Sequence, residues 1–185
     1  GLYFTDSYTI PEKITTMFSI PTEYVTQYLN KKIPDKDIII AIQIDKVIFF
    51  NQTDRLVDKP ILINQIWKNV SNISAGIMLV LKNIPKLYLF TDEYYYKISA
   101  PFFGKSTDTP LDVTNKVKLS SSIIWKFDMG TGCNKIDAII PVYSKINILN
   151  IKYYIFQNNS YIRYNIAKNK PDTIISDITT QSYYL

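Results

Sequence analysis

The chain has 185 residues, a hydrophobic content of 46% and a formal net charge of +5. This length and composition predict one folded domain and argue against a disordered or fibrous chain. Histidine is absent and cysteine occurs once, which excludes a Ser-His-Asp triad, a Cys-His dyad, a histidine-ligated haem and an internal disulfide.

The positive charge does not predict a nucleic-acid partner, because the basic residues are scattered along the sequence. No run of 18 apolar residues is present, so we expect no transmembrane segment. The sequence starts at Gly1 inside a strand-like segment, which indicates a processed or trimmed N-terminus.

Short aromatic strands recur four times, each followed by a turn. The copies align on Phe4, Phe50, Phe90 and Phe156, at steps of 46, 40 and 66 residues. Spacings of this size are typical of repeated supersecondary units that pack against one another. The fifteen tyrosines and many isoleucines also favour strands, because aromatic and β-branched side chains pack well in sheets. The pattern predicts an all-β fold.

The first two copies differ in completeness. The first begins at its second strand, residues 2–4, and we expect residues 14–18 to close it. The second has predicted strands at residues 39–42 and 47–50, and residues 63–67 are expected to close it.

The third copy is the clearest. Residues 73–80 predict a first strand whose small side chains suit a crowded axis, and residues 87–90 and 94–98 predict an antiparallel hairpin. Residues 117–125 predict an outer strand or a short helix that carries a large hydrophobic side chain. In the fourth copy the expected strands are residues 136–139, 153–156, 160–164 and 174–178.

Units of this kind cannot bury their own faces, so they must pack together, and four four-stranded sheets in a ring make a small β-propeller. The first unit lacks its inner strand. Residues 182–185 could complete it beside residues 2–4, or they could form a frayed tail. We place the four units of this single domain at residues 1–33, 34–70, 71–128 and 129–185.

The fourth copy resembles a hemopexin-type repeat. That family pairs an Ile-Asp-Ala-Ala strand with a Tyr-x-Phe strand and a Tyr-x-Arg-Tyr strand, and Ile136-Asp137-Ala138-Ile139, Tyr154-Ile155-Phe156 and Tyr161-Ile162-Arg163-Tyr164 follow this order. The resemblance implies a four-bladed β-propeller like those of freestanding microbial or plant hemopexin-like proteins. The chain departs from vertebrate members, because Cys133 alone cannot form their ring-closing disulfide.

Members of this family have an axial tunnel where backbone carbonyls of the first strands are candidate cation ligands. By position, the resemblance implies the carbonyls of Ile40, Ser74 and Asp137. Oxygen ligands suit a hard cation such as calcium or sodium. Two alternatives stay open: the neighbouring Ala41, Ala75 and Ala138 are small because the axis is crowded, and Asp137 caps a turn.

The resemblance implies a non-catalytic binding module that acts on another protein or a surface glycan, outside or released from the producing cell. The bias toward Lys, Asn, Ile and Tyr is typical of an AT-rich genome, which is consistent with a toxin-associated accessory protein of a microbe. Two alternatives are a small-ligand or metal-ion carrier that uses the tunnel, and a carbohydrate-active enzyme. Acid pairs such as Asp92-Glu93 fall in predicted turns, so they do not favour the enzyme.

Partner contacts are expected in the insertion at residues 102–108, and we select Phe102, Phe103 and Lys105. Atypical loops on a rigid scaffold often carry binding residues. The alternative is that this insertion is a simple surface excursion.

Overall fold

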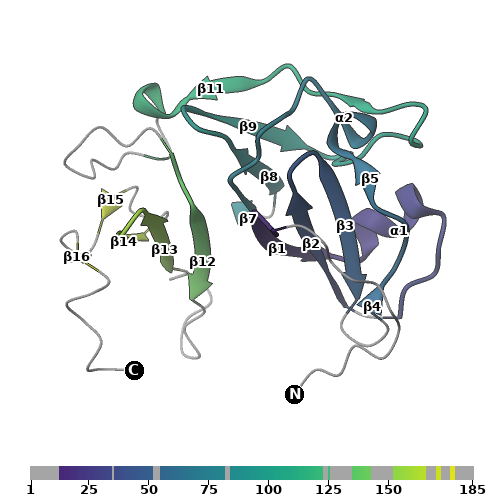
Figure 1. The fold of residues 1–185 in the computed structure, drawn as a ribbon, viewed down its shortest axis with the longest axis horizontal. Coiled ribbons are helices and arrows are strands. Elements are labelled where there is room, and N and C mark those ends of the chain that lie inside the picture. Colours follow the sequence, from purple (N-terminus) through teal and green to yellow (C-terminus); the bar gives the residue numbers. More distant parts are fainter. Residues whose placement is uncertain are drawn as a thin grey trace.

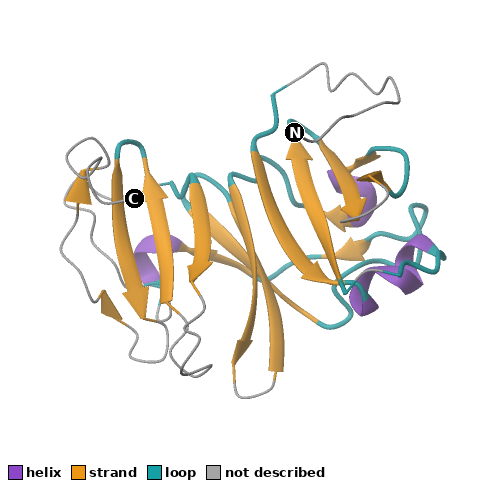
Figure 2. Ribbon diagram, turned by 90° about the horizontal axis from the view of Figure 1, so that it is seen from below, coloured by secondary structure: helices purple, strands orange, loops and turns teal. Residues whose placement is uncertain are grey.

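The computed structural model describes residues 13–34, 36–51, 55–81, 84–122, 125, 135–142, 152–165, 170–171 and 176–177. Within these residues the fold is mostly β, with three antiparallel sheets side by side (Figures 1 and 2). None of the helices in this part of the chain is both long and apolar enough to span a membrane. The first aromatic copy at residues 2–4 and the C-terminal residues 182–185 lie outside the described residues.

The first sheet holds five antiparallel strands, and a helix links two of them: β1 (Thr16–Pro21), α1 (Glu23–Leu29), β2 (Asp37–Gln43), β3 (Lys46–Asn51), β4 (Arg55–Leu56) and β5 (Ile61–Leu62). The strands predicted at residues 39–42 and 47–50 are confirmed as β2 and β3, which pair as a hairpin. The helix α1 packs its buried residues Val25, Tyr28 and Leu29 into the core.

Strand β1 corrects one prediction. It pairs with β2 along its whole length, with Phe18 opposite Ile40. Phe18 and Ile20 are buried while Met17 is 62% exposed, an alternation typical of a strand with one face in the core. Residues 14–18 were expected to close the first copy, but residues from Thr16 onward form the edge of the second copy's sheet.

The middle sheet contains β7 (Ala75–Leu81), β8 (Ile84–Phe90), β9 (Tyr94–Ser99) and β11 (Lys116–Lys118), in the order β11-β9-β8-β7. These strands confirm the predicted strands of the third copy. A 3₁₀ helix, η1 (Leu119–Ser121), follows β11, and Trp125 beyond it is buried. The expected outer strand is therefore present as the short β11, and the large hydrophobic side chain, Trp125, lies beyond η1 rather than on the strand.

The third sheet contains β12 (Ala138–Val142), β13 (Lys152–Gln157), β14 (Ser160–Asn165), β15 (Lys170–Pro171) and β16 (Ser176–Asp177). Its three longer strands confirm the strands predicted for the fourth copy. The short β16, within the segment expected to close this copy, pairs with β14.

A small connecting layer lies between the first and middle sheets. Residues 63–67 form α2 (Ile63–Ile66) and the start of β6 (Trp67–Lys68), which pairs in parallel with β10 (Leu111–Asp112). Trp67 is fully buried, and its indole N–H donates a hydrogen bond of 2.7 Å to the carbonyl of Phe102.

The middle sheet buries both of its faces. Along β8, Leu87 and Leu89 belong to a first core cluster shared with β1–β3, α1 and α2, whereas Tyr88 and Phe90 belong to a second core cluster shared with β12–β14. Side chains that alternate along a strand point to opposite faces of the sheet. A buried side chain of this size contributes about 1.5–3 kcal/mol to the stability of the fold. Because β8 places such side chains in both clusters, it joins the two clusters into one folded unit.

The sheets meet along their edge strands, because β7 contacts both β1 and β12 (Figure 1). Gly76 of β7 lies against the ring of Phe18 of β1, so closely that a Cβ atom would overlap the ring. A glycine is required where two backbones and a ring approach this closely. The small residue therefore allows β7 to pack closely on β1, whereas the axis of a ring stays a prediction.

Candidate functional site

Two of the predicted cation ligands occupy matching positions. The backbone N–H of Ser74 donates to the carbonyl of Phe90 at 2.8 Å, and the N–H of Asp137 donates to the carbonyl of Phe156 at 2.9 Å. Ala75 and Ala138 then pair with these same phenylalanines. The third and fourth copies therefore share one register.

Ile40 does not occupy the same position. It lies on β2, which is paired with β1 on one side and β3 on the other, so its peptide group belongs to a sheet interior. The register also differs, because Phe50 pairs with Ile39 while Ala41 pairs with Ile48. The Ile40 carbonyl therefore has a different setting from those of Ser74 and Asp137, because β1 forms the edge of this sheet, and its role as a cation ligand stays a prediction.

The junction of β1, β7 and β12 contains an apolar groove of about 200 Å³. Met17, Met78 and Ile140 contribute side chains to its walls. Ser19 is the lining residue whose side chain carries an oxygen, so a cation bound here would depend mainly on backbone carbonyls. Among the described residues, no three His, Cys, Asp or Glu side chains gather in a way that could hold a metal.

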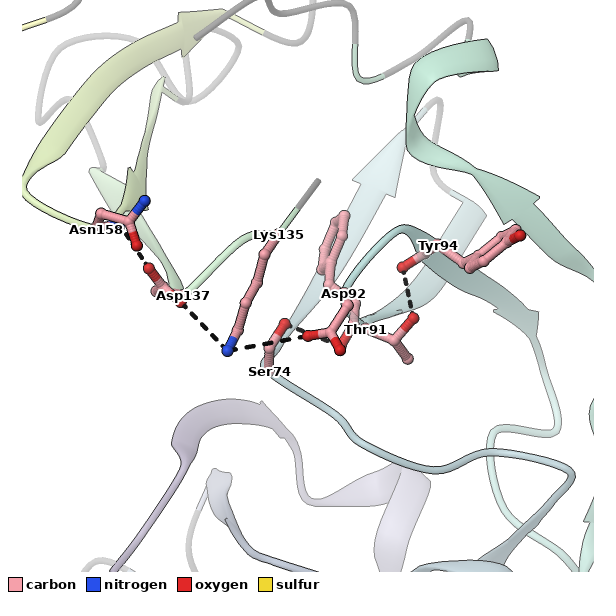
Figure 3. A network of polar contacts seen from close by, with 8 residues as sticks. Ser74, Thr91, Asp92, Tyr94, Lys135, Asp137 and Asn158 are labelled. Atoms are coloured by element: carbon pink, nitrogen blue, oxygen red, sulfur yellow. Dashed lines mark hydrogen bonds and ion pairs between the residues drawn. The ribbon is translucent and has the colours of Figure 1, made fainter. Parts of the chain in front are cut away.

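Asp137 caps a turn, as the alternative interpretation predicted. Its Oδ2 accepts a hydrogen bond of 2.6 Å from the backbone N–H of Asn158, in the turn between β13 and β14. Its Oδ1 lies 3.8 Å from Nζ of Lys135, and the same ammonium lies 3.9 Å from Oδ1 of Asp92 (Figure 3). Lys135 thus connects the third sheet to the β8–β9 turn of the middle sheet, through side chains that remain largely exposed.

The predicted partner-binding loop is mostly core. Phe102 and Phe103 are 2% and 4% exposed, and the ring of Phe103 stacks on Tyr28 at 5.4 Å. The rings of Trp67 and Phe103 lie 5.7 Å apart. These burials correct the expectation that Phe102 and Phe103 contact a partner. Lys105 is the exposed member of the three.

An open pocket of about 300 Å³ lies beside the β8–β9 turn. We call it the Tyr94 pocket. Its walls combine aromatic rings, carboxylates, an amide, hydroxyl groups and one ammonium group, from Ser71, Asn72, Thr91, Asp92, Glu93, Tyr94, Tyr96 and Lys116. Sequence reasoning treated Asp92-Glu93 as solvated turn residues, because it could not place Lys116 or Asn72 beside them.

The backbone around the Tyr94 pocket is held by hydrogen bonds. The N–H of Thr91 donates to the Tyr94 carbonyl at 2.8 Å, which fixes the β8–β9 turn. The N–H of Leu119 donates to the Glu93 carbonyl at 2.9 Å, which fixes η1 against the same turn. The hydroxyl of Tyr96 donates to the Asn69 carbonyl at 2.9 Å. The pocket is therefore largely preformed.

The charges of the Tyr94 pocket are arranged unevenly. Nζ of Lys116 lies 4.2 Å from the centroid of the Tyr94 ring and 5.9 Å from that of Tyr96, a cation–π arrangement. Asp92 and Glu93 are exposed at the turn. Two carboxylates and the Lys116 ammonium therefore border the pocket, and the Asp92 carboxylate also lies 3.9 Å from the Lys135 ammonium.

Comparisons with known proteins indicate the fold. No protein-family model and no curated protein matches the chain. Among solved structures, the chain is similar to hemopexin fold protein CP4 from cow pea, with a TM-score of 0.60 and 12% identity over 91% of this chain and 69% of that one.

Two structures from Cicer arietinum are equally similar, each with a TM-score of 0.60 over 91% of this chain and 69% of the other. One is a plant lectin with two metal binding sites, at 14% identity. The other is a plant albumin showing hemagglutination, at 15% identity. At these identities the likeness concerns the fold alone, and the chain has a hemopexin-like fold.

Proposed function

We propose that this protein is a non-catalytic binding domain whose ligand is a glycan or another protein. The observation that carries this proposal is the Tyr94 pocket: it is open, polar and built from turns on a hydrogen-bonded sheet. Binding residues commonly lie on turns and loops that a rigid scaffold positions. A preformed site also lowers the entropic cost of binding.

The named neighbours support a binding role. A lectin and a hemagglutinating albumin have this fold, and both names describe binding rather than catalysis. We also propose that the three sheets are blades of a hemopexin-type propeller, supported by the shared register of Ser74 and Asp137 and by the contacts of β7 with β1 and β12. A calcium or sodium ion at the axis, release from the cell and association with a toxin stay predictions of the resemblance.

The test uses the purified full chain labelled with a fluorophore. We expect saturable binding to erythrocytes or to a glycan array, without release of reducing sugars from a panel of polysaccharides. Binding that persists after enzymatic removal of the surface glycans would identify a protein ligand. Absence of saturable binding to intact cells and to the array, or reproducible polysaccharide turnover, would overturn the proposal.

A further inference from the structure

The Tyr94 pocket has the size and openness of a site for one end of a larger ligand. Its volume of about 300 Å³ lies at the lower limit for small-molecule sites. It opens to solvent beside the exposed residues Asp92, Glu93 and Lys116, so a chain attached to the bound unit can leave toward solvent. This geometry favours the terminal unit of an oligomer over a fully enclosed ligand.

Hydrogen-bonding groups surround the pocket and favour a ligand with many hydroxyl groups. The carboxylates of Asp92 and Glu93 accept hydrogen bonds, Lys116 donates them, and the amide of Asn72 does both. Hydrogen bonds from neutral hydroxyl groups to a carboxylate are charge-assisted and stronger than those between neutral groups. An apolar ligand would leave these groups without partners, which costs free energy when they are desolvated.

Tyr94 adds an apolar wall to these polar groups. Its ring also attracts the Lys116 ammonium, and so holds a hydrogen-bond donor at the pocket. A sugar ring presents both hydroxyl groups and apolar C–H groups, and a partly exposed tyrosine can contact both kinds. The combination of one aromatic wall, two carboxylates and one ammonium therefore matches a carbohydrate.

The charged groups at the Tyr94 pocket narrow the class of ligand further. The carboxylates of Asp92 and Glu93 line the pocket, but Asp92 already lies 3.9 Å from the Lys135 ammonium, and the Lys116 ammonium lies over the Tyr94 ring. A sialylated or sulfated terminus would bring another negative charge next to the Glu93 carboxylate, and like charges at this range repel. A neutral sugar meets no such repulsion.

We propose that the Tyr94 pocket binds the neutral terminal sugar of a glycan, with Asp92 and Glu93 accepting from its hydroxyl groups and with Tyr94 and Lys116 contributing to the wall that the sugar contacts. This inference rests on the proposed binding function and names the ligand class and the site. The experiment therefore has a second arm, which distinguishes failure of this ligand and site assignment from failure of the binding function itself.

The experiment compares variants of the full chain on a glycan array with neutral, sialylated and sulfated termini, followed by calorimetric titration with the best neutral oligosaccharide. Tyr94→Ala is expected to weaken binding about tenfold or more, because it removes the wall and the ring that positions Lys116. Tyr94→Phe keeps both and is expected to stay within about threefold of the wild type. The double variant Asp92→Asn, Glu93→Gln keeps the shape and is expected to weaken neutral-sugar binding and to raise binding to sialylated termini.

Tyr154→Ala is the matched control. Tyr154 is a partly exposed tyrosine on β13, in the third sheet, and it lies outside the Tyr94 pocket. Its removal should leave binding unchanged. Should Tyr94→Ala fail to fold, as judged by circular dichroism, the carboxylate double variant still tests the site.

The inference is overturned when the wild type binds only glycan-free protein or anionic glycans, or when the Tyr94 and carboxylate variants bind neutral glycans as tightly as the wild type does. In these cases the binding function stands and the assignment of ligand and site fails. Absence of any saturable binding by the folded wild type overturns both.

Discussion

At the residue scale, the buried Tyr88 makes the free energy of unfolding depend on pH in the alkaline range. Its side chain is fully buried, and its hydroxyl has no hydrogen-bond partner among the described residues. Burial raises the pKa of Tyr88 from 10.0 to about 12, and the charge interaction with Tyr95 adds to this rise. The unfolded chain ionises first as the pH increases, so we expect the free energy of unfolding to fall between about pH 10 and pH 12.

Tyr88→Phe isolates the contribution of this residue. The variant removes an unpaired buried hydroxyl, and we expect it to be about 1 kcal/mol more stable than the wild type at pH 7. It should also lose less stability between pH 9 and pH 11, although Tyr28, whose pKa burial likewise raises to about 12, still contributes. Urea denaturation at each pH measures both effects. An unchanged pH dependence would show that the Tyr88 phenol is not shielded from water.

Gly76 determines how closely two strands approach. A Cβ atom at this position would overlap the ring of Phe18, which is itself buried. We expect Gly76→Ala to cost about 1–3 kcal/mol through overpacking, as measured by urea denaturation. In a Phe18→Leu background the same substitution should cost less, because the ring atoms that it meets are gone. Additive costs in the double variant would mean that the two side chains do not meet.

At the scale of single elements, the loop that contains Phe102 and Phe103 acts as a core anchor. Phe103 packs against Tyr28 and Trp67, and the Phe102 carbonyl accepts the indole hydrogen bond of Trp67. Phe103→Ala should therefore cost about 3–5 kcal/mol, whereas the exposed Lys105→Ala should change stability little. Chemical denaturation compares the two variants. Equal, small effects would restore the interpretation of this loop as a partner-binding surface.

The hairpins could be predicted from sequence, whereas the anchor loop could not. In β8 the residues Leu87 to Phe90 form a continuous apolar run bounded by turns, which predicts a buried strand from local sequence alone. Phe102 and Phe103 stand in a polar insertion, and their burial depends on Trp67, 35 residues before Phe102. Contacts at such separations leave no periodic signal.

The Tyr94 pocket could not be predicted from the sequence either, because it also depends on contacts between residues far apart in the chain. Asp92 and Glu93 are visible in the sequence as an acid pair before three tyrosines. Lys116 reaches them because β11 pairs with β9, which places it opposite Tyr96. The outer strand of this copy was expected, but its register was not, and the register decides which side chains face the pocket.

At the scale of the whole molecule, the two core clusters share the middle sheet. Leu87 and Leu89 contribute to the first core cluster, and Tyr88 and Phe90 contribute to the second. Unfolding of either outer sheet would expose one face of β8. The described sheets should therefore unfold together, as expected of one domain rather than of independent repeats.

The two tryptophans report on this coupling separately, because Trp67 belongs to the first core cluster and Trp125 to the second. Trp125 packs edge-on against Phe90 at 5.1 Å and contacts Tyr164 at 6.3 Å, so its fluorescence senses the junction with the third sheet. In the variant Trp67→Phe, Trp125 fluorescence and circular dichroism should give the same urea midpoint. In Trp125→Phe, Trp67 fluorescence and circular dichroism should coincide as well. A Trp125 transition at lower urea than the dichroism change would show that the third sheet unfolds by itself, and β8 would then not couple the clusters.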